Sequence, residues 1–298
     1  MPERQALFFV FNQTIMIRIA IQAKGRLSEE SAELLTEAGL AAEESKRKLV
    51  ARCKWFPMEI LYLRDDDIPQ AVSMGVADIG IVGLNEVEEK LFPVEKIYTF
   101  SFGKCRMSLA IPRGEEYMDV NYFEGKRIAT SYPNILENYL RNEGIKAEIH
   151  QIAGSVEIAP SVGLADAIFD IVSTGGTLIS NGLREVVTVM DSHAVLIATP
   201  GLEVSKREIL DQLVVRFESV ERSKGMKYLL MNLPRNVIDD AIRLLPGMRS
   251  PTILPLAQDG WCSVHVAVYE RDLWQKLEKL KSLGAEGILV LSLEKMVP

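Results

Sequence analysis

Hydrophobic positions from residue 17 onward alternate between short apolar runs and longer amphipathic segments. Residues 17–21 (IRIAI) and 59–63 (EILYL) have the length of strands, and residues 28–38 between them carry apolar side chains at helical spacing. Strands that alternate with helices are typical of α/β folds with a largely parallel sheet. The pattern continues to about residue 105 and predicts a helix at 68–74, a strand at 78–82, a helix at 85–91 and a strand at 94–100.

A second α/β run follows from residue 106. It predicts strands at 107–111, 127–131, 147–152, 168–172, 185–190 and 194–198, and a helix at 135–142. Residues 205–208 (SKRE) match a capping box, in which a serine hydroxyl and a glutamate three residues later satisfy the first free amides of a helix. A helix is therefore expected to start there and to end by Ser223. The four-residue spacing of Ile209, Leu213 and Phe217 predicts that one of its faces is buried.

The last 75 or so residues have a different order of elements. Strands are predicted at 227–233, 252–256, 262–269 and 288–291, and helices at 237–244 and 273–282. Asp259-Gly260 between two of these strands is a hairpin signal. The order β-α-β-β-α-β predicts a ferredoxin-like domain.

Composition and charge exclude several classes of protein. With 298 residues the chain is longer than one hydrophobic core usually supports, so more than one domain is expected. The net charge of -7 argues against a nucleic-acid or anionic membrane partner. The three cysteines and three histidines lack the spacing of a disulfide framework or a zinc site, which fits a reducing cytoplasm. Residues 1–15 precede the first clear strand and are expected to form a disordered N-terminal extension.

The most informative segment is an apolar strand at 166–172 that leads into Ser173-Thr174-Gly175-Gly176-Thr177-Leu178. Glycines let backbone amides approach an anion closely, and the hydroxyls add further donors, so such a turn can hold a phosphate without lysine. Asp170, just before the turn, can accept hydrogen bonds from both hydroxyls of a ribose. An equally simple alternative is that Gly175 and Gly176 only turn the chain from strand to helix.

This segment resembles the loop of phosphoribosyltransferases that binds phosphoribosyl pyrophosphate (PRPP), although the usual acidic pair is a single Asp170 here, preceded by Phe169. Four further blocks lie in matching order at residues 23–27 (AKGRL), 63–69 (LRDDDIP), 75–83 (GVADIGIVG) and 154–160 (GSVEIAP). From residue 16 to residue 297 the chain resembles the long form of ATP phosphoribosyltransferase, the first enzyme of histidine biosynthesis.

The resemblance implies a fold of two periplasmic-binding-protein-like α/β lobes and a C-terminal ferredoxin-like (ACT-like) domain. Catalytic lobe I would comprise residues 16–105 and 192–219, because the chain returns to it after lobe II. Catalytic lobe II, with the PRPP loop, would comprise residues 106–191, and the regulatory domain residues 220–298.

The resemblance also implies roles for individual residues. Asp170, Lys24 and Arg26 would be catalytic. The PRPP contacts would be Asp170, Ser173, Thr174, Gly175, Gly176, Thr177, Leu178 and Glu157. The contacts to ATP or pyrophosphate would be Lys24, Gly25, Arg26, Arg64 and Arg106. From the residues alone, Lys24 and Arg26 also fit a solvated basic pair.

Mg²⁺ is the expected cofactor, since it rides on substrate phosphates and keeps several of its waters. No metal ligand is assigned for that reason. Asp65, Asp66 and Asp67 leave two alternatives open: a magnesium-binding cluster, or a cap in which Asp66 or Asp67 satisfies the helix that begins at Ile68.

The implied reaction joins adenine N1 of ATP to the ribose of PRPP and releases pyrophosphate, with histidine as feedback inhibitor. The hairpin at residues 250–268 would line the histidine site, with contacts from Ser250, Thr252 and Leu254. The family implies a homodimer that becomes a homohexamer when inhibited. The alternative for this domain is a module that serves assembly only.

Three other functions compete with this interpretation. A solute-binding or sensing module also has two α/β lobes, but we identify neither a signal peptide nor a helix-turn-helix. A type I phosphoribosyltransferase acting on another base would lack the ordered blocks and the ferredoxin-like tail. An inactive paralogue is disfavoured because Lys24, Arg26, Asp170 and the whole loop are present.

Overall fold

A computed structural model of the chain describes residues 15–41, 49–245, 247–248 and 250–297. The extension predicted at residues 1–15 lies outside these ranges apart from its last residue. The chain divides into two compact units, Met1–Leu210 and Asp211–Pro298. Among the described residues, no helix has the length and apolar character needed to cross a membrane.

The first unit begins with a six-stranded sheet in the order β2-β3-β1-β4-β11-β5. The central strands β1 (Ile17–Gln22), β3 (Met58–Leu63) and β4 (Ile79–Gly83) are parallel, whereas β11 (Ala194–Ala198) runs antiparallel between β4 and β5 (Glu95–Thr99). The short β2 (Val50–Arg52) pairs antiparallel with β3. Central strands are covered on both faces, which explains their nearly continuous apolar sequences.

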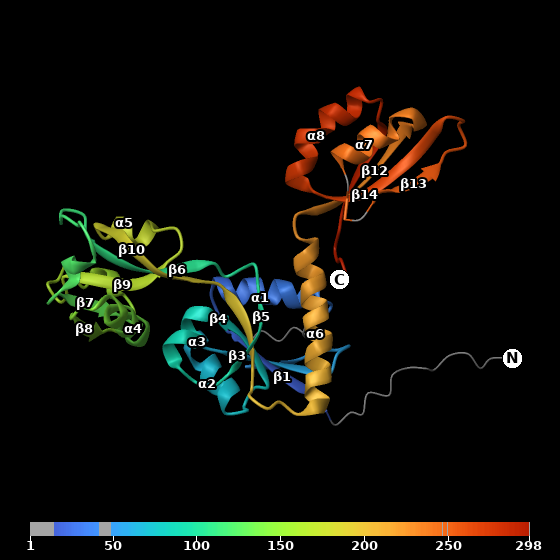
Figure 1. Ribbon diagram of the computed structural model, residues 1–298. Helices are drawn as coiled ribbons and strands as arrows, with labels where there is room; N and C mark the ends of the chain where they lie inside the picture. The colour runs from blue at the N-terminus through green and yellow to red at the C-terminus, as the bar shows by residue number, and fades with distance from the viewer. Residues whose placement is uncertain (1–14, 42–48, 246, 249, 298) are drawn as a thin grey trace. The chain divides into compact units, whose positions relative to one another are not determined.

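Three helices connect these strands: α1 (Arg26–Glu37), α2 (Ile68–Ser73) and α3 (Leu84–Lys90). α2 and α3 pack on one face of the sheet, where Ile68, Val72 and Val87 join one buried cluster with residues of β1, β4 and β11 (Figure 1). A 3-10 turn, Asp65–Asp67, precedes α2. This sheet and its helices form lobe I.

Lobe II is built on a five-stranded sheet in the order β10-β6-β9-β7-β8. β9 (Ala167–Val172) lies parallel to β7 (Arg127–Thr130) and antiparallel to β6 (Cys105–Pro112). β8 (Glu148–Gln151) is parallel to β7, and β10 (Leu183–Ser192) is antiparallel to β6 with two register shifts. The helices are α4 (Pro133–Glu143) and the short α5 (Gly176–Ser180). Two further 3-10 turns are Val120–Phe123 and Val156–Ile158.

The chain passes between the two sheets twice, after β5 and after β10. The two crossing segments are hydrogen-bonded to each other, since the Phe100 amide donates to the Ala194 carbonyl (2.9 Å) and the Ala194 amide donates to the Phe102 carbonyl (3.1 Å). Gly103 in the first crossing has φ of +66°, and a Cβ there would lie 3.1 Å from the Ala194 amide nitrogen. Glycine therefore fits this position for both its backbone conformation and its close neighbour.

The second unit begins at Asp211, within helix α6 (Val204–Ser223). Its sheet has the order β13-β14-β12-β15, with β12 (Met226–Pro234) paired antiparallel to both β14 (Trp261–Tyr269) and β15 (Glu286–Ser292). β13 (Thr252–Pro255) is the edge strand next to β14. A fourth 3-10 turn, Arg235–Val237, leads into α7 (Ile238–Leu244).

α7 and α8 (Glu270–Ser282) lie on one face of this sheet (Figure 1). The core between them includes Leu229, Met231, Val264 and Leu280. The arrangement is the ferredoxin-like one, so the predicted fold class, two α/β lobes followed by such a domain, is confirmed.

The capping box predicted at residues 205–208 is wrong, and so is the alternative in which Asp66 or Asp67 caps the helix that begins, as predicted, at Ile68. α6 begins at Val204, so Ser205 lies inside the first turn, and its hydroxyl donates to the Glu203 carboxylate (2.6 Å) instead of capping free amides. Neither Asp66 nor Asp67 caps α2: the three aspartates form the 3-10 turn, and Asp67 at the N-cap position makes no capping hydrogen bond with its side chain. Before α2, the 3-10 turn takes the aspartates that could have capped the helix.

Candidate active site

The loop after β9 joins a buried strand to a short helix. Ala167, Ile168 and Phe169 are fully buried, which fixes the strand, and Gly175 then turns the chain with φ of +79° at the N-cap of α5. A side chain at this left-handed position would be strained, so the loop requires glycine there. The sequence folds into the predicted turn between strand and helix.

The side chains of this loop divide into an anchor and an exposed set of donors. Leu178 is buried and packs with Ile168 and Val172, whereas Ser173, Thr174 and Thr177 are exposed. Within the described residues, the hydroxyls of those three side chains have no hydrogen-bond partner. Leu178 thus anchors the loop to the core of lobe II. The exposed side chains present hydroxyl donors to solvent, together with the free amides of the first helical turn.

Asp170 lies on β9 just before the loop, and its carboxylate accepts from the Ile171 amide (2.7 Å). Burial raises its pKa from an ordinary 3.8 to about 6, and the negative charge of Glu157 adds to the increase. Glu157 lies in the 3-10 turn Val156–Ile158, directly after Ser155, whose φ is +49°. The two carboxylates are therefore close enough to interact, and the pKa of Asp170 lies well above that of an ordinary aspartate.

In lobe I, the second predicted cluster lies where β1 ends and α1 begins. Gly25 has φ of +104° at the N-cap, and α1 starts at Arg26, earlier than the predicted residue 28. The Arg26 guanidinium donates to the Lys104 carbonyl (3.0 Å) and lies 3.6 Å from Glu30. Its side chain is still 55% exposed, so it can also reach a ligand. Lys24, one residue before Gly25, is exposed as well.

A cavity of about 270 Å³ contains residues from both clusters. Arg26 comes from lobe I and Ser173 from the loop of lobe II, so the structure brings these two predicted residues together. The complete lining is Gln22, Arg26, Leu27, Asp65, Gly83, Asn85, Glu86, Gly103, Cys105, Ile171 and Ser173. The other predicted contacts do not line this cavity, among them Asp170, Lys24, Thr174 and Glu157.

The two remaining arginines are engaged in ion pairs. Arg64 is largely exposed, and its guanidinium lies 3.2 Å from Asp66. Arg106 forms a bidentate pair with Glu185, which lowers the pKa of that carboxyl to about 2, and it also donates to the Ser173 carbonyl (3.2 Å). Arg106 thus stabilises the backbone of the loop through its hydrogen bond to the Ser173 carbonyl.

Sequence reasoning missed a buried polar group on α3. Glu86 is 4% exposed and accepts from Asn85 Nδ2 and from the Tyr132 hydroxyl, both at 3.0 Å. Burial raises its pKa to about 7, with a further contribution from the charge of Asp65. The signal was available, because Asn85 and Glu86 directly follow the carboxyl end of a buried parallel strand, where ligands of open α/β sheets bind.

Asp65 lines the cavity, whereas Asp66 lies between Arg64 (3.2 Å) and Lys90 (3.8 Å). In the described part of the chain, no group of three or more histidine, cysteine, aspartate or glutamate side chains could hold a metal ion by itself. A divalent cation here would need oxygen atoms from a bound substrate in addition to the carboxylate of Asp65 or Asp170.

The residues predicted for a histidine site lie on the edge of the C-terminal sheet. Thr252 and Leu254 are exposed on β13, opposite His265 and Ser263 of β14. The His265 ring contacts the Tyr228 hydroxyl and the Ser263 hydroxyl, each at 3.1 Å. Ser250 precedes β13, and its hydroxyl donates to the Pro251 carbonyl (3.1 Å).

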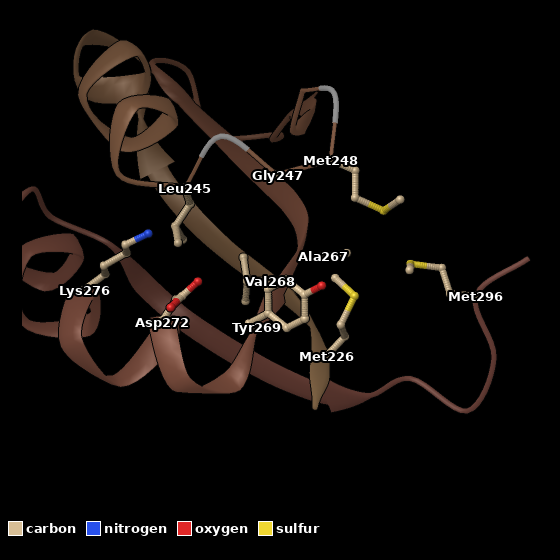
Figure 2. Close-up of a pocket in the computed structure, with 10 residues that line it drawn as sticks. All are labelled: Met226, Leu245, Gly247, Met248, Ala267, Val268, Tyr269, Asp272, Lys276 and Met296. Carbon is tan, nitrogen blue, oxygen red and sulfur yellow. The ribbon is translucent and has the colours of Figure 1, made fainter. Parts of the chain in front are cut away.

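A separate cavity of about 270 Å³ in this domain contains none of the three predicted contacts. Figure 2 shows the thioethers of Met226, Met248 and Met296 on one side of it and the charged Asp272 and Lys276 on the other. Ala267 and Val268, which belong to the predicted hairpin at 250–268, contribute to its wall.

Comparisons with known proteins cover both units. A family model described as "HisG: ATP phosphoribosyltransferase" matches residues 64–219, and one described as "HisG, C-terminal domain" matches residues 223–295. The ATP phosphoribosyltransferases of Bacteroides fragilis and Parabacteroides distasonis are 54% and 57% identical to this chain over 282 residues, which is 95% of the chain and the whole of each relative.

One solved structure extends this similarity to three dimensions. It is the ATP phosphoribosyl transferase (HisG:HisZ) complex from Thermotoga maritima, 31% identical with a TM-score of 0.59. The match covers 68% of this chain and 96% of that chain.

Proposed function

The chain belongs to the ATP phosphoribosyltransferase family, and from this premise we propose that it condenses ATP with PRPP to give N1-(5-phosphoribosyl)-ATP and pyrophosphate, the first step of histidine biosynthesis. One observation carries the proposal: the exposed hydroxyl loop of lobe II and the arginine of lobe I line the same cavity, through Ser173 and Arg26. Two substrates that each carry phosphates can therefore meet there.

PRPP would bind on lobe II. The hydroxyls of Ser173, Thr174 and Thr177, with the amides at Gly175 and Gly176, would donate to the 5-phosphate. Leu178 would hold the loop in place from the core. Asp170 would accept from the ribose hydroxyls, which requires the ionised carboxylate, and Glu157 would assist from the neighbouring turn.

The triphosphate of ATP and the departing pyrophosphate would face lobe I. Lys24 and Arg26 supply positive charge there, and Gly25 between them allows backbone to approach a phosphate closely. Arg64 is a weaker candidate because Asp66 already neutralises it. Arg106 is likewise a weaker candidate, and it would act mainly on the loop backbone, since it is held by Glu185 and by the Ser173 carbonyl.

Mg²⁺ fits this site as a companion of the substrate, because the cavity offers single carboxylates and the substrates supply many phosphate oxygens. Asp65 and Asp170 would hold it, directly or through water. When bound, the ion would neutralise charge on the departing pyrophosphate.

In the proposed reaction, a bond forms between adenine N1 and ribose C1 while the bond from C1 to the pyrophosphate oxygen breaks. The electron pair leaves with pyrophosphate, which Lys24 and Arg26 stabilise electrostatically. The protein forms no covalent bond, so its main task is to hold the two substrates in line. Orientation of this kind can lower a barrier by roughly 7 to 11 kcal/mol.

We propose that the C-terminal domain binds histidine as a feedback inhibitor through Ser250, Thr252 and Leu254. In an allosteric enzyme the inhibitor must bind two states with different affinity, and a change from homodimer to homohexamer would provide them. The protein would act in the cytoplasm, which fits its three widely spaced cysteines.

The test uses the purified full-length chain with ATP, PRPP, Mg²⁺ and pyrophosphatase, which pulls the reaction forward. We expect absorbance from phosphoribosyl-ATP, loss of product when EDTA removes the metal, and suppression by added histidine. Product that is insensitive to histidine would refute the regulatory role alone. Calorimetric binding of PRPP without product would favour a sensor or an inactive paralogue, and absence of PRPP binding would contradict the proposed function.

A further inference from the structure

The N-cap residue of helix α4 in lobe II does not cap the helix with its own side chain. Tyr132 occupies the N-cap position without a capping hydrogen bond, and Pro133 follows at the first helical position. The first amides of a helix have no partner within it, and a nearby serine, threonine, asparagine or aspartate usually satisfies them. In this helix the partner comes from the other lobe.

That partner is Glu89 on helix α3 of lobe I. Its carboxylate accepts from the Asn134 amide (3.1 Å to each oxygen) and from the Ile135 amide (3.0 Å), and its backbone carbonyl accepts from Asn134 Nδ2 (2.8 Å). Glu89 is only 4% exposed. A buried carboxylate at a helix N-terminus interacts favourably with the helix dipole, so these hydrogen bonds are stronger than those of an exposed pair.

One turn earlier on the same helix, Glu86 makes a second link to lobe II by accepting from the Tyr132 hydroxyl (3.0 Å). Glu86 also lines the cavity that contains Arg26 and Ser173. The contact between α3 and α4 therefore lies at the edge of the candidate active site.

From the N-terminus of α4, packing leads directly to the strand that carries the PRPP loop. Ile135 and Leu136 of α4 belong to the same buried cluster as Phe169 of β9. Phe169 is fully buried and precedes Asp170. A close-packed core deforms little, so a shift of α4 would also shift β9. The position of α4 relative to α3 therefore sets the position of Asp170 relative to lobe I.

We propose that Glu89 is a positioning residue of the transfer reaction: by capping α4 across the lobes, it holds the PRPP-binding strand of lobe II at a fixed distance from the phosphate-binding residues of lobe I. Glu86 reinforces the same contact through Tyr132. This inference rests on the proposed function, because the distance matters only when two substrates must react across it.

The kinetic test compares Glu89→Ala with a matched control, Glu88→Ala. Glu88 is the adjacent residue on α3, and it pairs at the surface with Lys96 (2.9 Å). We expect Glu89→Ala to lower kcat about 10- to 100-fold, because small displacements of reacting groups have effects of this size. The Kd for PRPP, which contacts lobe II, should change by less than about threefold. Glu89→Gln keeps one acceptor oxygen and should recover part of kcat, and Glu88→Ala should behave as wild type.

A second measurement does not depend on turnover. Hydrogen exchange at the Asn134 and Ile135 amides should accelerate about fivefold or more in Glu89→Ala, as expected for the loss of a helix cap, and should be unchanged in Glu88→Ala. Unchanged kcat in Glu89→Ala, or unchanged exchange, would overturn the inference. A loss of PRPP affinity equal to the loss of kcat would show that Glu89 maintains the fold of lobe II instead. Absence of transfer in the wild type would contradict the proposed function, and the exchange comparison would still decide whether the cap across the lobes exists.

Discussion

The raised pKa of Asp170 predicts a specific pH dependence for PRPP use. The ribose role requires an ionised carboxylate, and the pKa of this group in the free protein is about 6. Such a group is about 90% ionised at pH 7 and about 10% ionised at pH 5, so kcat/KM for PRPP should fall roughly tenfold over that interval. With the ordinary pKa of 3.8, the same interval would change the ionised fraction by less than about 10%.

The assay measures kcat/KM for PRPP between pH 5 and pH 8 at saturating ATP, because this constant reports groups of the free enzyme. The 5-phosphate of PRPP also titrates near pH 6, with a second pKa of about 6. The wild-type profile alone is therefore ambiguous, and a variant that changes only the protein group is needed to separate the two titrations.

Glu157→Gln is that variant. The charge of Glu157 contributes to the raised pKa of Asp170, so its removal should lower that pKa and move the acidic limb of the profile to lower pH. Glu116→Gln, an exposed carboxylate on the same lobe, is the control and should leave the limb in place. An acidic limb that does not move in Glu157→Gln would refute the assignment of this titration to Asp170.

Two further predictions concern the loop and its support, and a third concerns the ion pair just before β9. Gly175→Ala should strain the left-handed N-cap of α5 (φ +79°) by about 1 kcal/mol or more and weaken PRPP binding correspondingly, as measured by calorimetry. Arg106→Met should leave Glu185 unpaired next to the loop and reduce PRPP affinity, whereas the double variant with Glu185→Gln should recover part of it. Asp166→Asn should remove the stabilisation that the ion pair with Arg127 provides. Arg127 lowers the pKa of Asp166 to about 2, so this stabilisation is present above pH 4 and lost as the pH falls toward about 2. Because the pair is partly exposed, denaturant titration should show a loss of about 1 kcal/mol or less in the free energy of unfolding.

Most of the fold was predictable because it depends on local pattern. Buried parallel strands such as β1 and β4 have nearly continuous apolar sequences, and the hairpin signal at Asp259-Gly260 separates β13 from β14. Two expected side-chain caps are absent for local reasons. α6 begins one residue before Ser205, whose hydroxyl donates to Glu203, and the three aspartates before α2 form a 3-10 turn.

The candidate site was predictable only where its residues are adjacent in the sequence. The loop at residues 173–178 forms one continuous segment, so its chemistry is visible in the sequence. Glu89 and Arg106 are different, since their partners, Asn134 and Glu185, lie 45 and 79 positions away. No spacing rule connects residues so distant, and only the packing of α3 on α4 and of β6 on β10 places them in contact.

Binding of PRPP by the loop after β9 can be measured by calorimetric titration of the full-length protein with PRPP and Mg²⁺. Thr174→Val removes one hydroxyl at nearly constant volume, and Asp170→Asn removes the acceptor charge. We expect the wild type to bind PRPP and each variant to bind at least about tenfold more weakly, in line with the loss of a hydrogen bond to a charged group. Wild-type affinity in both variants would contradict binding by this loop.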